Sequence, residues 1–338
     1  MNLDFREVFK RKYRDILAEY LKDEKEQALY LAQKLSRESI EHKVSPEEIV
    51  SMHKSLMMEI VSNVPKEVLR SFDILIEVMV GYGLAYREHQ SLRNQQQELK
   101  SEIAIASEMQ QTLLRTRIPQ VEGLDIGAIS VAAKHMSGDY YHFIQDDNNF
   151  IGVAIADVIG KGIPAALCMS MIKYAMDSMP DSRHQPSYIL ESLNRVVEHN
   201  VDPSMFITMF YGMYDPSKKS FLFASAGHEP GFYYDKKAGE FTDLYAKGLL
   251  LGIEKKTTYR QYEKHVNVGD MIVLLSDGVT ECRTKEGFIE RSQIVRLIEK
   301  NMHLHAQDIV NNVYKELERL QEFQLRDDFT LIILKRTS

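Results

Sequence analysis

The hydrophobic pattern of the chain changes near residue 120, and this change separates a helical part from a mixed part. Before it, apolar residues recur at spacings of three and four, as at Tyr13, Ile16 and Leu17, which is typical of helices that bury one face. After it, short β-rich runs alternate with turn residues. A chain of 338 residues is long enough for two domains with separate cores. We therefore expect a helical domain followed by an α+β domain.

Residues 1–82 are predicted to form a small bundle of about four helices. Ser45-Pro46-Glu47-Glu48 has the composition of a helix start, with a capping serine, a proline in the first turn and a glutamate three residues after the cap. Val64-Pro65 interrupts the apolar pattern, which then resumes. The surplus of apolar residues also suits a docking or dimerisation face.

Residues 83–118 are predicted to form a helical linker. From Leu84 to about Leu114 the chain has neither glycine nor proline. A heptad pattern runs through this segment and predicts a coiled-coil seam between two copies of the chain, with a solvated linker helix as the alternative. The seam positions are Leu92, Gln96, Leu99, Ile103, Ala106, Gln110 and Leu113. Its two glutamines would make the pairing weak, and Ile118-Pro119 is expected to end the helix.

The remaining residues, 119–338, are predicted to form two β-sheets flanked by helices, because mostly consecutive strands with helices in blocks are typical of α+β domains. The predicted strands are Leu124 to Ser130, Phe150 to Ala156, Met205 to Tyr214, Phe221 to Ala226, Gly231 to Tyr234, Met271 to Ser276 and Phe329 to Leu334. The predicted helices are Ile163 to Ser178, Pro186 to Asn200 and Gln293 to about Leu320.

Four acidic stretches accompany these runs, and at least three of them lie at the edge of an apolar run. They are Ser137-Gly138-Asp139, Ala156-Asp157-Val158, Ser276-Asp277-Gly278 and Asp327-Asp328-Phe329-Thr330. Carboxylates packed together repel and are costly to desolvate, and a cation is the usual remedy. Ligation by oxygen alone favours Mg²⁺ or Mn²⁺ over zinc. A pair of such ions suits phosphoryl hydrolysis.

Composition excludes several other classes of protein. The formal net charge is -7, and the sequence offers no basic stripe that would follow nucleic-acid phosphates. Cys168 and Cys282 have no CxxC partner, which favours a reduced protein. The charged start lacks a signal-peptide pattern, and no apolar run approaches the length of a membrane span. We expect a cytoplasmic protein that binds neither nucleic acid nor membrane.

The motifs of residues 120–335 resemble, in family order, those of the PPM-type, metal-dependent serine/threonine phosphatases. They are SGDYYHF, IADVIGKGIPAAL, SMFITMFYG, FASAGHEPGFYY, GDMIVLLSDGVTE and DDFTLIIL. The AGHEP and SDGVTE forms are similar to the bacterial branch of sporulation and stress-response phosphatases. A single aspartate at a strand end is more often a turn residue, but four in this order favour a shared site.

The resemblance implies a site for two Mn²⁺ or Mg²⁺ ions. Asp157 matches the bridging aspartate of the family, and the carbonyl oxygen of Val158 is a further ligand where many members have glycine. Asp139 and Asp277 match two more acidic ligands. Asp327 matches the last one, with its neighbour Asp328 as the alternative.

The same resemblance implies hydrolysis of phosphoserine or phosphothreonine on a protein by an activated water. The expected substrate is a phosphorylated anti-anti-sigma factor, whose dephosphorylation would activate the general stress sigma factor. A switch kinase-like protein would activate the phosphatase by binding the N-terminal bundle and favouring a homodimer. The competing hypotheses are an inactive scaffold, which should have lost a carboxylate, and a two-metal nuclease or phosphodiesterase, which the acidic chain disfavours.

Two further motifs carry weaker signals. Gly160-Lys161-Gly162 lacks the spacing of a nucleotide-binding loop, so a tight turn into a helix starting near Ile163-Pro164 explains it better. His228 in AGHEP is a candidate proton donor, but a structural role in a turn is the favoured interpretation.

Overall fold

The computed structural model describes residues 3–338 except 135, 147–148, 159, 161, 180–184, 203–204, 285–286 and 324. Its internal contacts divide the chain into two compact units, Met1–Ser101 and Glu102–Ser338, called here the helical unit and the sheet unit. Among the described residues, no helix combines the length and apolar character needed to cross a lipid bilayer.

The helical unit confirms the predicted helices of the N-terminal region. It contains α1 (Leu3–Asp23), α2 (Glu26–Glu41), α3 (Pro46–Ile60) and the first part of α4 (Lys66–Leu113). The predicted start of α3 is present: the Ser45 hydroxyl accepts a hydrogen bond from the Glu48 backbone N–H at 3.3 Å, and the Glu48 carboxylate accepts one from the Ser45 N–H at 3.4 Å. This reciprocal pairing satisfies two amides that the helix itself leaves open.

Helix α4 is longer at its N-terminal side than the predicted linker helix and ends earlier. It continues through Gly81 and Gly83, because a glycine inside a helix costs about 1 kcal/mol relative to alanine without stopping it. Its last residue is Leu113, ahead of the stop predicted at Ile118-Pro119. From Glu102 onward α4 belongs to the sheet unit.

The strands of the sheet unit form two five-stranded antiparallel sheets within the described residues. One sheet has the order β1-β12-β9-β6-β7, and the other has the order β2-β3-β4-β5-β8. The first comprises β1 (Leu124–Val131), β6 (Gly231–Asp235), β7 (Glu240–Leu244), β9 (Met271–Leu275) and β12 (Phe329–Arg336). The second comprises β2 (Asp139–Gln145), β3 (Ile151–Val158), β4 (Ile207–Asp215), β5 (Ser220–Ala226) and β8 (Tyr262–His265). A small hairpin pairs β10 (Arg283–Thr284) with β11 (Gly287–Phe288).

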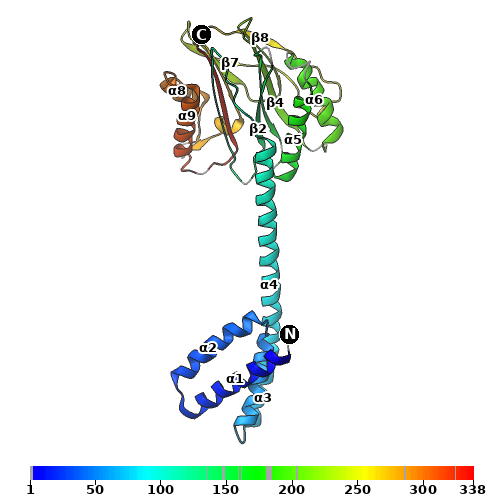
Figure 1. The fold of residues 1–338 in the computed structure, drawn as a ribbon, viewed down its shortest axis with the longest axis vertical. Coiled ribbons are helices and arrows are strands. Elements are labelled where there is room, and N and C mark those ends of the chain that lie inside the picture. Colours follow the sequence, from blue (N-terminus) through cyan, green and yellow to red (C-terminus); the bar gives the residue numbers. More distant parts are fainter. Residues whose placement is uncertain are drawn as a thin grey trace. The chain divides into compact units, whose positions relative to one another are not determined.

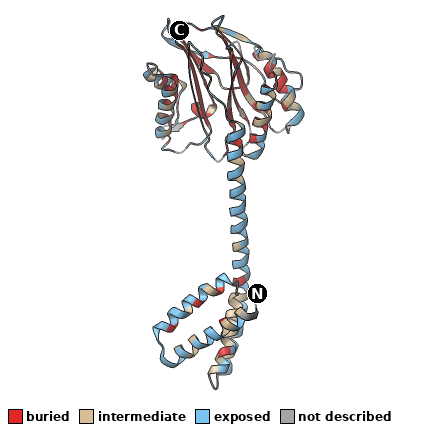
Figure 2. Ribbon diagram, viewed as in Figure 1, coloured by how far each residue is buried: buried red, intermediate tan, exposed pale blue. Residues whose placement is uncertain are grey.

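The sheets lie face to face between two layers of helices (Figure 1). Helices α5 (Ile163–Asp177) and α6 (Pro186–Asn200) cover the β2 sheet, and α8 (Arg291–Asn301) and α9 (Ala306–Leu320) cover the β12 sheet. Burial follows the strands of both sheets (Figure 2). Alternate residues of β12 face opposite ways: Ile332 lies in the core between the sheets, and Ile333 lies in the core under α8 and α9. The predicted two-sheet architecture is therefore confirmed.

Several features of the sheet unit differ from the sequence-based expectation, and strands β7 and β8 and the hairpin of β10 and β11 were not predicted. Strand β2, with the sequence DYYHFIQ, was missed because its buried residues do not alternate with polar ones. The predicted helix from Gln293 to Leu320 is two helices, α8 and α9, separated by a short turn. Lys335 Nζ donates to the Met302 and Leu304 carbonyls in this turn, which supplies a partner for backbone oxygens at the end of α8.

Candidate active site

Two of the predicted aspartates lie directly opposite each other in the β2 sheet. Asp139 is the first residue of β2, Asp157 is the last but one of β3, and the antiparallel register pairs them. Residues paired in this way have Cβ atoms about 5 Å apart, and like charges at such positions are destabilising. The sequence therefore places two carboxylates where only a positive charge or a proton removes the repulsion.

The other predicted aspartates lie at one end of two neighbouring strands in the β12 sheet. Ser276 and Asp277 directly follow β9, whereas Asp327 and Asp328 directly precede β12. Strands β9 and β12 are antiparallel neighbours, so the end of one lies beside the start of the other. Burial raises the pKa of Asp277, and the charge of Asp327 adds to the rise. These two carboxylates therefore act on one another.

Asp328 connects the two groups of acidic residues. Its Oδ1 atom accepts a hydrogen bond from the Ala133 N–H at 2.8 Å, and its Oδ2 atom accepts one from the Gly138 N–H at 2.5 Å. Its backbone carbonyl accepts one from the Ser276 hydroxyl at 3.3 Å. The residue that precedes β12 thus holds the loop that leads into Asp139.

Asp139 is the most deeply buried of these aspartates. It is 4% exposed, and its Oδ2 atom has no hydrogen-bond partner among the described residues. Burial is the main cause that raises the pKa of Asp139 well above its ordinary value. Hydrogen bonding to Ser276 and Thr330 lowers the pKa in part, and the charges of Asp157 and Asp328 raise it further. A buried carboxylate with an oxygen left open is costly, and a cation would offset that cost.

The space beside Gly138 shows how oxygen atoms converge near Asp139. A Cβ atom at position 138 would lie 3.2 Å from Asp157 Oδ1, 3.4 Å from the Val158 carbonyl oxygen and 3.5 Å from the Gly160 carbonyl oxygen. At Gly278, a Cβ would collide with the Asp328 carbonyl at 2.0 Å. Gly278 is therefore needed for close backbone approach, whereas a side chain at position 138 would be tight only against the Asp157 carboxylate.

The donor atoms at this site are of the kind that binds a hard divalent cation. The converging donors are carboxylate and carbonyl oxygens, which Mg²⁺ and Mn²⁺ prefer. Within the described part of the chain, no three His, Cys, Asp or Glu side chains are close enough to form a complete ligand set. The aspartates form neighbouring pairs, Asp139 with Asp157 and Asp277 with Asp327.

The surroundings of the two candidates for the last ligand differ. The Asp328 carboxylate already accepts hydrogen bonds from two backbone amides. Asp327 is exposed, its carboxylate accepts a hydrogen bond from the Asp328 N–H at 3.1 Å, and its charge raises the pKa of Asp277. Asp327 is therefore the better candidate for an ion ligand, and Asp328 the better candidate for a residue that organises the loop.

The structure describes most residues of the two weaker motifs. His228 is 7% exposed and shares a hydrogen bond with the Thr208 hydroxyl at 2.9 Å. Burial lowers the pKa of His228 to about 4, so the ring is neutral at pH 7 and holds no proton to donate as an imidazolium. Gly162, with φ of +82°, precedes α5, which begins at Ile163 as predicted. Lys161 lies outside the described residues.

Sequence reasoning placed Gln110 in the linker seam, but the structure places its side chain inside the sheet unit. Gln110 is 6% exposed and bonded to the backbone of Ser137. A heptad pattern records only spacing, and it does not reveal which neighbour a buried amide meets.

Two family profiles match the chain. The profile described as "Stage II sporulation protein E (SpoIIE)" matches residues 147–337. The profile described as "Phosphoserine phosphatase RsbU, N-terminal domain" matches residues 11–85.

Individual relatives agree with these profiles. Phosphoserine phosphatase RsbU of Bacillus subtilis (strain 168) is 60% identical over 334 residues, which cover 99% of each chain. Among solved structures, the SiaA-PP2C domain of Pseudomonas aeruginosa has a TM-score of 0.60 at 18% identity, covering 72% of this chain and 98% of that one. The RsbU and RsbW domains of a Mycobacterium tuberculosis protein give a TM-score of 0.54 at 23% identity, covering 66% and 62%. The solved structures support the fold alone.

Proposed function

The chain belongs to the RsbU family of phosphoserine phosphatases, with a catalytic domain of the SpoIIE type, and from this premise we propose that it is a Mn²⁺- or Mg²⁺-dependent enzyme that dephosphorylates an anti-anti-sigma factor. The main support is the buried Asp139 carboxylate, which has an open oxygen and lies opposite Asp157. Dephosphorylation of that substrate would activate the general stress sigma factor.

In this proposal Asp139, Asp157, the Val158 carbonyl, Asp277 and Asp327 hold two divalent ions. When bound, such ions lower the pKa of water and neutralise charge on a phosphate. The aspartates fix where the ions bind, and Asp328 keeps the loop before Asp139 in place through the Gly138 N–H. Water adds to phosphorus and gives up a proton as the bond between phosphorus and the serine oxygen breaks, and the serine oxygen takes up a proton to leave as the hydroxyl.

The described cysteines support direct attack by water. Cys282 is 1% exposed, and burial raises its pKa to about 11. Cys168 is also buried, and burial raises its pKa. Reactive cysteines have lowered pKa values and solvent access, so neither thiol is suited to form a phosphocysteine intermediate.

Chelation should remove activity reversibly. Treatment with EDTA should lower turnover of a phosphoserine protein at least about tenfold, because the ions supply much of the transition-state charge stabilisation. Added Mn²⁺ or Mg²⁺ should restore the turnover. A reducing agent added without metal serves as the control, and recovery by thiols alone would contradict the metal-dependent mechanism.

Substrate choice separates the proposed function from its alternatives. The purified chain with Mn²⁺ should release phosphate from a phosphoserine protein and leave a phosphodiester intact. An inactive scaffold would hydrolyse neither substrate, and a nuclease or phosphodiesterase would cleave the diester.

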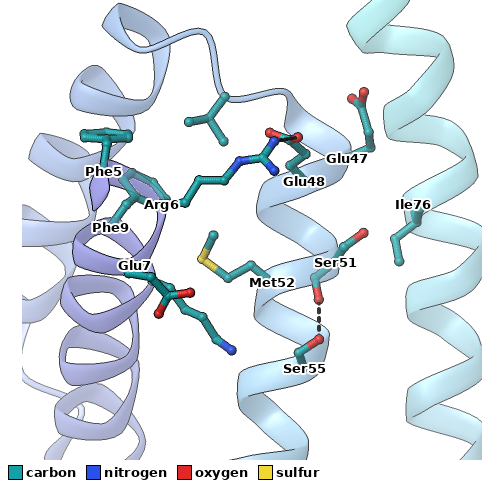
Figure 3. A pocket seen from close by; sticks show the side chains of 12 residues that line it. Phe5, Arg6, Glu7, Phe9, Glu47, Glu48, Ser51, Met52, Ser55 and Ile76 are labelled. Atoms are coloured by element: carbon teal, nitrogen blue, oxygen red, sulfur yellow. Dashed lines mark hydrogen bonds and ion pairs between the residues drawn. The ribbon is translucent and has the colours of Figure 1, made fainter. Parts of the chain in front are cut away.

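We also propose that the helical unit receives an activating, switch kinase-like partner. A hollow of about 410 Å³ lies against α1, α3 and α4 in this unit (Figure 3). Its lining combines apolar groups such as Phe9 and Met52 with the ion pair of Arg6 and Glu48. A recess that offers both apolar area and charges suits a protein partner.

Exposed apolar residues on α4 support pairing of two copies. Ile74, Val78 and Tyr82 follow one helix face at spacings of four and are 72%, 57% and 62% exposed. Further along the helix, Leu92 and Leu99 are also exposed. Single exposed apolar residues are common, but a stripe at helical spacing is typical of an interface.

The seam prediction now depends on Gln96, because the Gln110 amide is bonded inside the sheet unit. Gln96→Leu should strengthen self-association and raise basal phosphatase activity without the partner, because an amide at a seam position weakens a coiled coil. Sedimentation and turnover of the same preparation measure both effects.

Gln97→Leu provides the matched control, since it adds the same apolar group one residue away from the seam. Leu99 changed to a charged residue should have the opposite effect and block activation by the partner. If Gln96→Leu associates more tightly but its basal activity is unchanged, the seam does not control catalysis.

A further inference from the structure

One buried side chain at the end of α4 meets the loop that precedes Asp139. Gln110 Nε2 donates a hydrogen bond to the Ser137 carbonyl at 2.8 Å, and Gln110 Oε1 accepts one from the Ser137 N–H at 3.3 Å. The donor and the acceptor of the Gln110 amide are therefore both bonded to the backbone of one residue, Ser137. A buried amide is tolerated when its donor and acceptor are both satisfied, and no apolar or shorter side chain would satisfy both at this distance.

The residue held by Gln110 is in turn bonded to Asp139. The Ser137 hydroxyl accepts a hydrogen bond from the Asp139 N–H at 3.1 Å. Between them, Gly138 donates its N–H to Asp328. The loop is thus fixed on one side by α4 and on the other by the residue before β12.

The residues after Gln110 attach the C-terminal end of α4 to strand β2 and to the core under α5 and α6. Leu114 packs against the core under α5 and α6, which contains Tyr140 and Val158. The Thr116 hydroxyl accepts a hydrogen bond from the Phe143 N–H on β2 at 3.1 Å. Because one residue of an α-helix turns by about 100°, rotation of α4 by a single residue would remove Gln110 from Ser137.

We propose that Gln110 is a positioning residue that sets the affinity of the active site for its divalent ion by holding Ser137, and through it Asp139, in the binding geometry. This inference rests on the proposed metal-dependent function. Gln110 would not touch the ion or the phosphate, and it would act only through the loop.

The test replaces Gln110 with methionine, which has similar length and no hydrogen-bonding amide. Mn²⁺ binding, measured by calorimetry without substrate, should weaken about tenfold or more, as is usual when a residue that supports a metal ligand is removed. The Mn²⁺ concentration for half-maximal phosphatase activity should rise in parallel, and the KM for the phosphoprotein should stay unchanged. Gln110→Asn, which keeps the amide but is shorter by one methylene group, should show the same weakening.

Two controls make the result specific. Gln111→Met makes the same change at the next residue, which is exposed, and should leave Mn²⁺ affinity unchanged. Ser137→Ala removes the hydroxyl that accepts the hydrogen bond from the Asp139 N–H. The double variant Ser137→Ala, Gln110→Met should weaken Mn²⁺ binding by much less than the product of the two single effects. The reason is that both residues act through one loop. Thermal unfolding of the metal-free variants establishes that they are folded.

The outcomes distinguish this inference from the proposed function. If folded Gln110→Met and Gln110→Asn bind Mn²⁺ as the unmodified protein does, the positioning role is wrong. It is also wrong if Gln111→Met weakens binding equally or if the Ser137 effect is fully additive. If the unmodified protein neither binds Mn²⁺ nor depends on it for activity, the proposed metal-dependent function itself is wrong.

Discussion

Asp157→Asn should lower kcat/KM for a phosphoserine protein by about 10³-fold, because loss of a metal ligand removes several kcal/mol of transition-state stabilisation. Asparagine has nearly the same shape, so the core of the β2 sheet keeps its volume. In the metal-free protein the change also removes one of two opposing carboxylates. The metal-free variant should therefore unfold at a temperature no lower than that of the unmodified protein.

Turnover at saturating Mn²⁺ and thermal unfolding without metal measure the two expectations separately. Glu240→Gln, at an exposed position on β7, neutralises a carboxylate outside the site and should change neither. If Asp157→Asn keeps more than about a tenth of the turnover, its role as a metal ligand is wrong, because a lost ligand should cost several kcal/mol.

The two-sheet architecture could be predicted from the sequence because short β-rich runs separated by turn residues mark most of the strands. Strand β3 is an informative case: Val153 faces the core between the sheets and Ala154 faces the core under α5 and α6. A strand buried on both faces reads as a continuous apolar run, which still identifies it. Strand β2 has no such run, and its aromatic residues gave no clear period.

The candidate site was predictable in its aspartates and in the Val158 carbonyl, but not in how these groups meet. A motif places Asp139 and Asp157 in the chain, but their direct opposition depends on the register of β2 with β3. The pairing of Gln110 with Ser137 joins residues 27 positions apart. Spacing within the sequence carries no information about such a contact, since it exists only after the helix packs on the sheet unit.

Asp327→Asn and Asp328→Asn should fail in different ways. Asp327 is exposed and its charge acts on Asp277, so Asp327→Asn should lower kcat/KM by about 10³-fold as a ligand is lost. Its stability without metal should remain almost unchanged, because an exposed carboxylate contributes little to folding.

Asp328→Asn should instead destabilise the metal-free protein by about 1–3 kcal/mol, since an asparagine has a single acceptor oxygen and leaves the N–H of Ala133 or Gly138 without its partner. Its activity should fall less, by about 10- to 100-fold, the usual cost of losing a residue that supports a metal ligand.

Denaturant unfolding without metal measures the stability of both variants, and turnover at saturating Mn²⁺ measures their activity. Loss of activity at unchanged stability in Asp328→Asn, together with near-normal activity in Asp327→Asn, would reverse the two assignments. Asp328 would then be the ion ligand. The Ala133 and Gly138 N–H groups, which now donate to its carboxylate, would need another acceptor.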